Sequence, residues 1–397
     1  MFFLLSSLAA CGRWAVLMAG SSDWYNYRHQ ADIATLYDLL INRSFPPEHI
    51  ITVAYDDEPY LAENPYRGKL FHNTDHHNFY HGSSKIDYAG AKVTVDALYN
   101  IISGEHKEHG KVLESTEEDD VFIYYDNHGA DGALGVPEGA PKFILFDDLG
   151  DSFKTMYNKK MYKRLLFMVE AYESGNLPKY LPIPNAVVIT AAKHDENSWA
   201  AIPDAELDNM LSDEFTFAAI DLINKSDYTI DEFYQNLVKG TTHSTPQIGG
   251  GGYPALKDTH ISAWFGEYTK KPEESVSKPR PKVAEAIPQR EVLRHYLKHR
   301  TDLSAMKQLH ELDANTQKTI KKFEDIAYLL NINNLQKVQN PTDDHYKCFF
   351  DSMRAFSKKY GTVHPDDMGL TRKLLDMCAV RPKEMVIKAI EAIWKIE

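Results

Sequence analysis

The sequence has few cysteines, no long apolar run and fewer basic than acidic residues. Its three cysteines form no CxxC pair of the kind that holds a structural metal ion. No stretch reaches the roughly 18 consecutive apolar residues that a transmembrane helix needs. The 44 basic and 57 acidic residues give a formal net charge of -13, which argues against a general phosphate-binding surface. We therefore expect a soluble protein with no nucleic-acid partner, no membrane span, no metal and no cofactor.

The composition is that of an ordinary globular protein. Apolar residues make up 43% and aromatic residues 12% of the 397 residues. A chain of this length can bury one large core and still form a smaller second unit. Its 17 histidines would gain positive charge as the pH falls toward about 6.5, which suits an acidic compartment.

The N-terminal residues 1–12 begin with the apolar run MFFLLSSLAA and have no basic segment before it. We interpret them as a weak or shortened secretory signal, although the run also suits a lead-in to the first strand. Two glycosylation sequons, at Asn42 and Asn224, are compatible with secretion. We expect a protein of the secretory pathway, in a lysosome or vacuole or outside the cell.

The first two-thirds of the chain alternate short apolar runs with helical patterns. Each run is nearly continuous and of strand length, as expected for parallel strands that are buried on both faces. This alternation predicts an α/β sheet whose strands are joined by right-handed helical crossovers. The expected strands are Trp14–Ala19, Ile50–Tyr55, Val121–Tyr125, Leu165–Val169 and Ala186–Thr190, and two expected helices are Gln30–Asn42 and Val93–Ile102.

The composition changes near the end of the expected sheet. Residues 270–290 interleave prolines with lysines, glutamates and serines, which predicts an exposed linker. We therefore divide the chain into a main domain at 13–269, this linker and a helical domain at 291–397. If the remaining cysteine leaves with the signal segment, Cys348 and Cys378 can form one disulfide in the helical domain.

Polar segments follow three of the expected strands, and the last two of these segments contain glycine. They are Ser21–His29, Asp126–Gly129 and Glu170–Gly175. In an open parallel sheet, reactive residues collect just past the carboxyl ends of the strands. A histidine at such an end that is followed by glycine suits a general base beside a backbone N–H donor, as at His128. From composition alone, a structural histidine explains the same residue.

Several long motifs share their order and spacing with one known family. The longest is AGSSDWYNYRHQAD at residues 19–32, and the others are Tyr55-Asp56-Asp57, His128-Gly129, Lys160-Met161-Tyr162, and Glu170-Ala171 followed by Glu173-Ser174-Gly175. Together they resemble the legumains, the asparaginyl endopeptidases of peptidase family C13, over about 13–268 and more weakly beyond. The resemblance implies a caspase-like, mostly parallel sheet flanked by helices. It also implies a C-terminal all-α, death-domain-like prodomain over the cleft.

The resemblance implies roles for individual residues. His128 matches the family's general base, Gly129 its backbone oxyanion donor, and Asn26 the residue that orients the histidine. A charged pocket would read the side chain of a substrate asparagine, because an amide needs both donor and acceptor partners. A structural ion pair is the alternative explanation for two of the pocket residues, Arg28 and Glu170. The implied substrate-binding residues are Arg28, Glu170, Asp213, His29 and Ser198.

Tyr172 stands where this family carries its nucleophilic cysteine. A thiol has a pKa near 8.5 that a neighbouring imidazolium lowers, whereas a phenol has a pKa near 10. At about pH 5, only on the order of one phenol in 10⁵ would be ionised. We therefore predict a legumain-family scaffold that is a zymogen-like, catalytically inactive homologue. Its expected partners are peptides or proteins with asparagine, proteases, and its own prodomain.

Two other interpretations stay open. The chain is an active asparaginyl endopeptidase proenzyme if Tyr172 is an engineered change, a sequence error or an unusual catalyst. A catalytic subunit of the GPI transamidase is disfavoured, because no C-terminal apolar span is present. Lys270–Ala314 also contains no asparagine at which a legumain would cleave itself, which favours the inactive homologue over the active proenzyme.

Two further clusters have simple explanations. The histidines in a polar segment suggest a solvated loop, since nothing fixes the geometry that a metal site needs. The glycine run lacks the strand and helix context of a phosphate-binding loop, so we expect a flexible hairpin or loop. These clusters are His72, His76, His77 and His81, and Gly249–Gly252.

Overall fold

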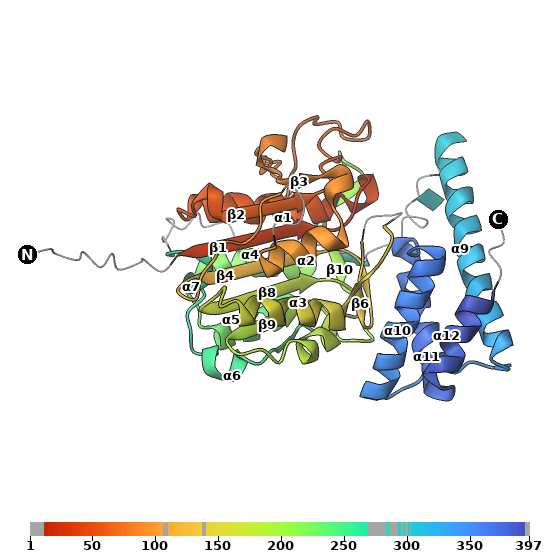
Figure 1. Cartoon of the computed structure of the whole chain (residues 1–397). Helices are drawn as coiled ribbons and strands as arrows, with labels where there is room; N and C mark the ends of the chain where they lie inside the picture. Colours follow the sequence, from red (N-terminus) through yellow and green to blue (C-terminus); the bar gives the residue numbers. More distant parts are fainter. Residues whose placement is uncertain are drawn as a thin grey trace, which may run out of the picture.

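The structure is a computed structural model. It describes residues 12–105, 110–136, 140–268, 283–285, 293–294, 297, 301 and 303–393. A seven-stranded sheet in the order β12-β9-β8-β4-β1-β2-β3 forms its centre, and helices cover both faces (Figure 1). Only β12 runs antiparallel to its neighbour. The strands are β1 (Arg13–Ala19), β2 (Ile50–Ala54), β3 (Tyr88–Ala89), β4 (Asp120–Asp126), β8 (Arg164–Glu170), β9 (Ala186–Thr190) and β12 (Gln247–Gly249).

The five predicted strands are the five long strands of this sheet, so the prediction of a mostly parallel α/β architecture is confirmed. Nearly every residue of β1, β2, β4, β8 and β9 is buried, because helices cover both faces. The register pairs Ala19 with Asp126, and Asp126 with Glu170. The polar segments that follow β1, β4 and β8 therefore start side by side at one edge of the sheet.

Alternate residues of each central strand enter different cores. Val16 and Met18 of β1 pack into one core, and Ala15 and Leu17 pack into the other. Helices α2 and α3 contribute to the first core, and α1, α4, α5, α6 and α7 contribute to the second. Their bounds are α1 (Tyr27–Asn42), α2 (Val95–Ser103), α3 (Phe146–Asn158), α4 (Glu214–Lys225), α5 (Ile230–Gly240), α6 (Tyr253–Leu256) and α7 (Ser262–Phe265).

Two small three-stranded sheets lie outside the central sheet. One joins β5 (Gly129–Ala130), β6 (Ala133–Leu134) and β7 (Ile144–Leu145), and the other joins β10 (Trp199–Asp204), β11 (Asn209–Asp213) and β13 (Val283–Glu285). Strand β13 comes from the segment predicted to be a linker and pairs antiparallel with β10. For these three residues a strand replaces the expected exposed linker. The rest of 270–290 lies outside the described residues.

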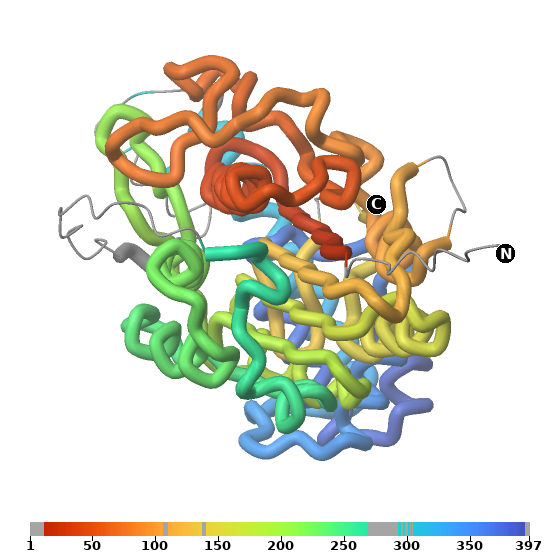
Figure 2. The backbone as a smooth tube through the Cα atoms, turned by 90° about the vertical axis from the view of Figure 1, so that its left-hand side faces the viewer, coloured from red at the N-terminus to blue at the C-terminus, as the bar shows by residue number. Residues whose placement is uncertain are grey.

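The C-terminal helices lie beside the carboxyl ends of the central strands (Figure 1). Figure 2 looks at the molecule from the other end, and there these helices lie mostly behind and below the sheet. Their apolar residues, such as Phe349 and Phe350, belong to the same core as the sheet residue Val16. The elements are α9 (Leu303–Leu329), α10 (Asp343–Tyr360), the 3₁₀ helix η6 (Pro365–Thr371), α11 (Arg372–Val380) and α12 (Lys383–Ala392).

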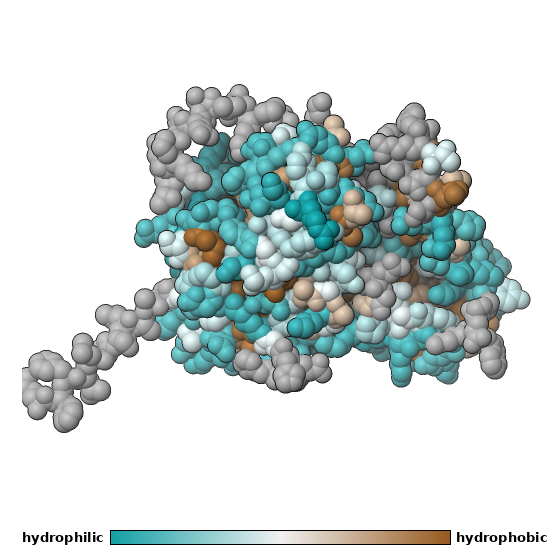
Figure 3. Space-filling model, turned by 90° about the horizontal axis from the view of Figure 1, so that it is seen from above, coloured by the Kyte–Doolittle hydropathy of each residue, from teal (hydrophilic) through white to brown (hydrophobic). Residues whose placement is uncertain are grey.

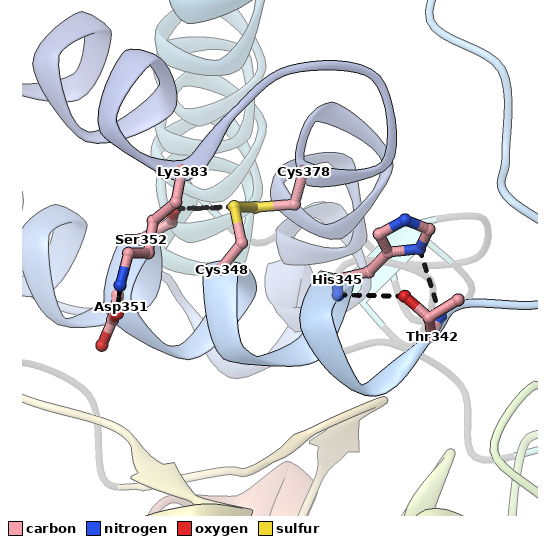
Figure 4. The surroundings of a disulfide bond; sticks show 7 residues. All are labelled: Thr342, His345, Cys348, Asp351, Ser352, Cys378 and Lys383. Atoms are coloured by element: carbon pink, nitrogen blue, oxygen red, sulfur yellow. Dashed lines mark hydrogen bonds and ion pairs between the residues drawn. A yellow bond between two sulfur atoms is a disulfide. The ribbon is translucent and has the colours of Figure 1, made fainter.

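The disulfide considered from the sequence is present in these helices. It joins Cys348 of α10 to Cys378 of α11, and its Cα atoms are 5.8 Å apart (Figure 4). One turn before it, Thr342 and His345 form a capping box at the start of α10. This end of α10 is therefore tied both by its cap and by a covalent bond to α11.

The surface seen in Figure 3 is mostly hydrophilic, and its hydrophobic residues form small, separate patches. None of the helices in the described part of the chain combines the length and apolarity needed to cross a membrane.

One histidine of the cluster and the glycine run differ from their predictions, whereas His77 and His81 are exposed as expected. His72 is buried rather than solvated, with its Nε2 2.9 Å from Ser212 Oγ and 3.1 Å from Asp32 Oδ1. In the glycine run, Gly249 ends the edge strand β12 and a tight turn at 251–252 follows it. At Gly250, which has φ 90°, an added Cβ would lie 2.5 Å from the carbonyl oxygen of Ala186. Packing against α1 and β9, which no local pattern reveals, decides both cases.

Candidate active site

His128 lies directly past β4, and its imidazole contacts an amide from the segment after β1. Its Nε2 is 2.7 Å from Oδ1 of Asn26. Asn26 uses its Nδ2 to donate to the carbonyl oxygen of Ser22, so its oxygen is the atom that faces the ring. An acceptor there requires a proton on His128 Nε2 and leaves Nδ1 as the basic nitrogen. The strand end and the 3₁₀ helix η1 (Trp24–Asn26) therefore fix both the position and the tautomer of this histidine.

The backbone of Gly129 lies against the backbone of position 172. A Cβ added to Gly129 would lie 2.4 Å from the carbonyl oxygen of Tyr172 and 3.1 Å from Cβ of Ala171. Only glycine permits this approach. On the other side, Glu173 has φ 51° and accepts a hydrogen bond from the backbone N–H of Asp131. Position 172 is therefore held from both sides by the segment that carries His128.

The phenol ring of Tyr172 faces the imidazole of His128. The two ring centroids are 5.5 Å apart and the planes meet at 71°. Burial raises the pKa of Tyr172 above its ordinary value, although Arg28 acts in the opposite direction. The nearby hydroxyl of Ser174 donates to the carbonyl oxygen of Ala171 at 2.8 Å, so it is already engaged with the backbone.

Burial also sets the charge of the histidine. It lowers the pKa of His128 well below the ordinary value, and the positive charge of Arg28 adds to the effect. The imidazole and the phenol are therefore both neutral near pH 7. The pair does not form the imidazolium and anion that activate a thiol nucleophile.

A second group of side chains surrounds Arg28, in the first turn of α1. Its Nε donates to Oδ1 of Asp213 at 2.8 Å, and its NH1 donates to the carbonyl oxygen of Tyr25 at 3.1 Å. Asp213 ends β11 and accepts the guanidinium while both side chains are almost fully buried. Burial raises the pKa of Asp213 to about 7, against the opposing effect of Arg28. Packing of α1 on β11 brings together two residues that are 185 positions apart.

Glu170, the last residue of β8, lies in the same group. One of its oxygens accepts a hydrogen bond from Thr216 at 3.3 Å, and Ser198 also hydrogen-bonds to the carboxylate. Burial raises the pKa of Glu170 well above the ordinary value, and the negative charge of Asp213 adds to the effect. A guanidinium, two carboxylates and a hydroxyl thus offer both donors and acceptors to an amide.

His29 is completely buried between the two groups. Its Nδ1 lies 2.6 Å from Oγ of Ser21, and its ring centroid is 5.4 Å from that of His128. The structure therefore brings all nine residues proposed from the sequence into one region at the ends of β1, β4 and β8. Their roles remain predictions.

Sequence reasoning missed two further carboxylates in this region. Asp126 ends β4 and its Oδ2 accepts a hydrogen bond from the Tyr124 hydroxyl at 2.9 Å. Asp32 lies one turn after His29 in α1, and its Oδ2 accepts from the backbone N–H of Asp213 at 3.1 Å. Both are fully buried, and burial raises the pKa of Asp126 well above the ordinary value. The available signal was a charged residue that closes a continuous apolar run.

The C-terminal helices contact the site through Asp131, three residues after His128. Oδ2 of Asp131 accepts from the Tyr346 hydroxyl at 2.6 Å and from Arg372 at 3.0 Å, and its Oδ1 accepts from Asn176 at 2.9 Å. The 3₁₀ helix η6 packs against β5, and Asp366 is close enough to raise the pKa of Tyr172. The helices therefore cover the side of the site that follows β4.

The comparisons with known proteins agree with this arrangement. The sequence profile of the Peptidase C13 family matches residues 13–267. A hemoglobinase of Schistosoma japonicum is 35% identical over 72% of this chain and 68% of its own length, and a vacuolar-processing enzyme of Citrus sinensis is 30% identical over 92% and 81%. Mouse legumain is 35% identical over 58% of this chain, which spans about half of that relative, 54%.

Among solved structures, caspase-1 of Spodoptera frugiperda is similar with a TM-score of 0.35 and 11% identity, over 66% of this chain and 92% of that one. The fold assignment rests on the sheet order itself and not on this likeness. The profile match covers well over half of the chain and includes all nine residues proposed from the sequence. This chain therefore belongs to the Peptidase C13 family.

Proposed function

We propose that this chain is a catalytically silent member of its family that binds peptides. The observation that carries the proposal is the phenol ring of Tyr172, which occupies the position facing His128. In the legumains that the motifs resemble, the corresponding position carries the nucleophilic cysteine. A general base without a competent nucleophile leaves the first step of peptide cleavage without its attacking group.

The chemistry of the phenol supports inactivity. Its ordinary pKa near 10 already leaves few anions at acidic pH, and burial raises the pKa of Tyr172 further. Deprotonation by His128 is also unfavourable, because burial lowers the pKa of that imidazole. A proton transfer between the two would have to overcome both shifts.

Peptide binding is supported by the charged pocket and by an edge of β10 that pairs with a strand distant in the sequence. Arg28, Glu170 and Asp213 supply donors and acceptors for an asparagine side chain, the substrate type of the legumains. Strand β10 already accepts an antiparallel strand from the chain's own β13, so its edge suits an extended peptide. We propose that peptides with an asparagine are the ligand class.

We also propose that the C-terminal helices act as a prodomain that stays docked. Support comes from the core they share with the sheet and from the buried ion pair between Arg372 and Asp131. The name of the vacuolar-processing enzymes points to an acidic compartment for those relatives. The secretory pathway is accordingly the proposed location of this chain.

A turnover assay tests the inactivity. The full chain would be acidified, with and without cleavage by an added protease, and offered a fluorogenic Ala-Ala-Asn substrate. We expect turnover by Tyr172→Cys and none by the unaltered chain. Tyr172→Ala is the matched control, because it removes the ring without supplying a thiol, and it should be inactive. Turnover by the unaltered chain equal to that of Tyr172→Cys would refute the proposal.

Calorimetry tests the binding. A peptide with a central asparagine would be titrated into the chain after cleavage by an added protease, and the same peptide with alanine at that position is the control. Heat from the asparagine peptide alone supports the pocket assignment. Absence of heat from both peptides counts against a peptide-binding function.

A further inference from the structure

His29 and Asp213 of the pocket also lie beside Asp126, a residue to which neither the family resemblance nor the proposed function gives a role. We infer that His29 Nε2, Asp126 Oδ1 and Asp213 Oδ2 form a binding site for a divalent transition-metal ion, with Zn²⁺ as the best match. The three atoms come from α1, β4 and β11, and all lie within 4.8 Å of one another. An ion there would join three segments that are distant in the sequence.

The distances are close to those of an assembled site. Nε2 of His29 lies 3.7 Å from Oδ1 of Asp126 and 3.7 Å from Oδ2 of Asp213. Zinc bonds of about 2.0–2.2 Å in a tetrahedron place neighbouring ligand atoms about 3.3 Å apart. The two distances from the histidine therefore exceed this spacing by only about 0.4 Å, and the two carboxylate oxygens lie within 4.8 Å of each other.

Each of the two carboxyl groups accepts a hydrogen bond at one oxygen and has no donor at the other. Oδ2 of Asp126 accepts from the Tyr124 hydroxyl, and Oδ1 of Asp213 accepts from Arg28. No donor among the described residues lies within hydrogen-bond distance of the opposite oxygens, Asp126 Oδ1 and Asp213 Oδ2. Buried polar atoms almost always have a bonding partner. Two oxygens without a donor that lie beside the same imidazole nitrogen are therefore expected to share a partner. A cation is the partner that satisfies both at once.

The second hydrogen bond of His29 favours this use of its ring. Its Nδ1 lies 2.6 Å from Oγ of Ser21, which can accept a proton from Nδ1 and leave the Nε2 lone pair toward the carboxylates. A proton on Nε2 instead would make no hydrogen bond to either carboxylate, because both oxygens lie 3.7 Å from Nε2.

The charge around the site also favours a cation. Asp32, Asp126, Glu170 and Asp213 are four buried carboxyl groups, and Arg28 is the positive group bonded within them. A divalent ion would compensate the charge of the two carboxylates that bind it. One imidazole nitrogen with two carboxylate oxygens suits Zn²⁺ better than Ca²⁺ or Mg²⁺, which prefer oxygen ligands alone. Three protein ligands leave one tetrahedral position for water or another ligand.

Zinc titration of the full chain tests the site. Chelator-treated protein would be titrated with Zn²⁺ near neutral pH by calorimetry, and Asp126→Asn would be compared with Asp38→Asn. Asp38 is the matched control, because it pairs with His81 at 2.9 Å in an exposed position. We expect one tight site in the parent and in Asp38→Asn, and at least 100-fold weaker binding by Asp126→Asn. Equal affinity of Asp126→Asn and the parent would overturn the inference.

A second readout covers misfolding and surface binding. Co²⁺ bound at the site should show the intense visible absorption of a four-coordinate ion, and this spectrum should persist when His76, His77 and His81 are changed to alanine. Absence of that spectrum in the parent, or its loss with the loop histidines, refutes the site even if Asp126→Asn fails to fold. Neither readout involves peptide turnover or peptide binding. Failure here therefore leaves the proposed function untouched, and failure of that function leaves the metal site untouched.

Discussion

The imidazole of His128 and the phenol of Tyr172 meet edge to face, with their ring centroids 5.5 Å apart. The contact follows from the backbone, since Gly129 lies directly against the carbonyl group of Tyr172. Position 172 would therefore face the histidine whichever side chain it carried. This makes the identity of one side chain, rather than the shape of the site, the basis of the proposed inactivity.

The close approach at Gly129 predicts a sharp intolerance of any side chain there. Gly129→Ala would place a methyl group 2.4 Å from the carbonyl oxygen of Tyr172, and the backbone must shift to relieve the clash. We expect a loss of about 1–3 kcal/mol in the free energy of unfolding, measured by urea denaturation. Gly369→Ala is the control, since nothing lies within 4 Å of its added Cβ, and it should be nearly neutral. Equal stability of the two variants would show that the approach is looser than described.

The buried ion pair between Arg372 and Asp131 predicts how firmly the C-terminal helices are docked. Arg372→Gln removes the charge that faces Asp131 while the carboxylate stays almost fully buried. We expect a loss of about 3 kcal/mol in the free energy of unfolding, and faster proteolysis of the chain between the sheet and the C-terminal helices. Lys383→Gln breaks the exposed pair with Asp351 and should cost less than about 1 kcal/mol. Docking does not depend on this pair if the two variants behave alike.

The buried carboxyl group of Asp126 predicts a gain in stability when its charge is removed. Burial, with Asp213 and Asp32, raises the pKa of Asp126, so the folded chain retains a proton that the unfolded chain releases. Its contribution to stability is therefore lost as the pH rises above about 4 toward the folded pKa. In chelator-treated protein, Asp126→Asn should raise the free energy of unfolding on the order of 1–3 kcal/mol at pH 7.5, and less at pH 5. A larger gain at pH 5 than at pH 7.5 would contradict this assignment.

The disulfide predicts a contribution to the helical domain alone. Cys348 and Cys378 close a loop with a sequence separation of 30 residues, for which loop entropy gives roughly 3–4 kcal/mol. Changing both cysteines to serine should lower the melting transition of the helices, as followed by circular dichroism. The double variant avoids a free thiol, and reduction of the unaltered chain should reproduce its effect. An unchanged transition after reduction would mean that packing alone holds α10 to α11.

The sequence predicts the central sheet well because its strands are buried on both faces. A continuous apolar run such as Leu165–Val169 indicates a strand that is buried on both faces. The strand in the structure, β8, extends one residue further at each end. The short strands β3, β5, β6, β7 and β13 were missed, since two or three residues carry no detectable pattern. Strand β10 was also missed, and its Pro203 argues against a strand in sequence terms. Pairing with neighbours, rather than local preference, forms these elements.

The site was predicted from motifs and not from spacing. Periodicity places His128 and Glu170 at strand ends. It cannot show that Asn26 reaches His128 across 102 residues, or that Asp213 lies in the same site. The resemblance to legumains supplied those partners. It could not supply Asp126, which no matched motif assigns, or the burial of His72 beneath α4 side chains such as Phe217. Both depend on contacts between segments that are far apart in the chain.

The most direct test of the proposed inactivity is covalent labelling at position 172. A peptide that ends in an asparagine-derived electrophile would be incubated with the unaltered chain and with Tyr172→Cys, each cleaved by an added protease, and intact masses would be recorded. We predict one adduct on Tyr172→Cys, mapped by peptide fragmentation to position 172, and none on the unaltered chain. An adduct on the unaltered chain, at Tyr172 or at any residue that contacts His128, would contradict the account.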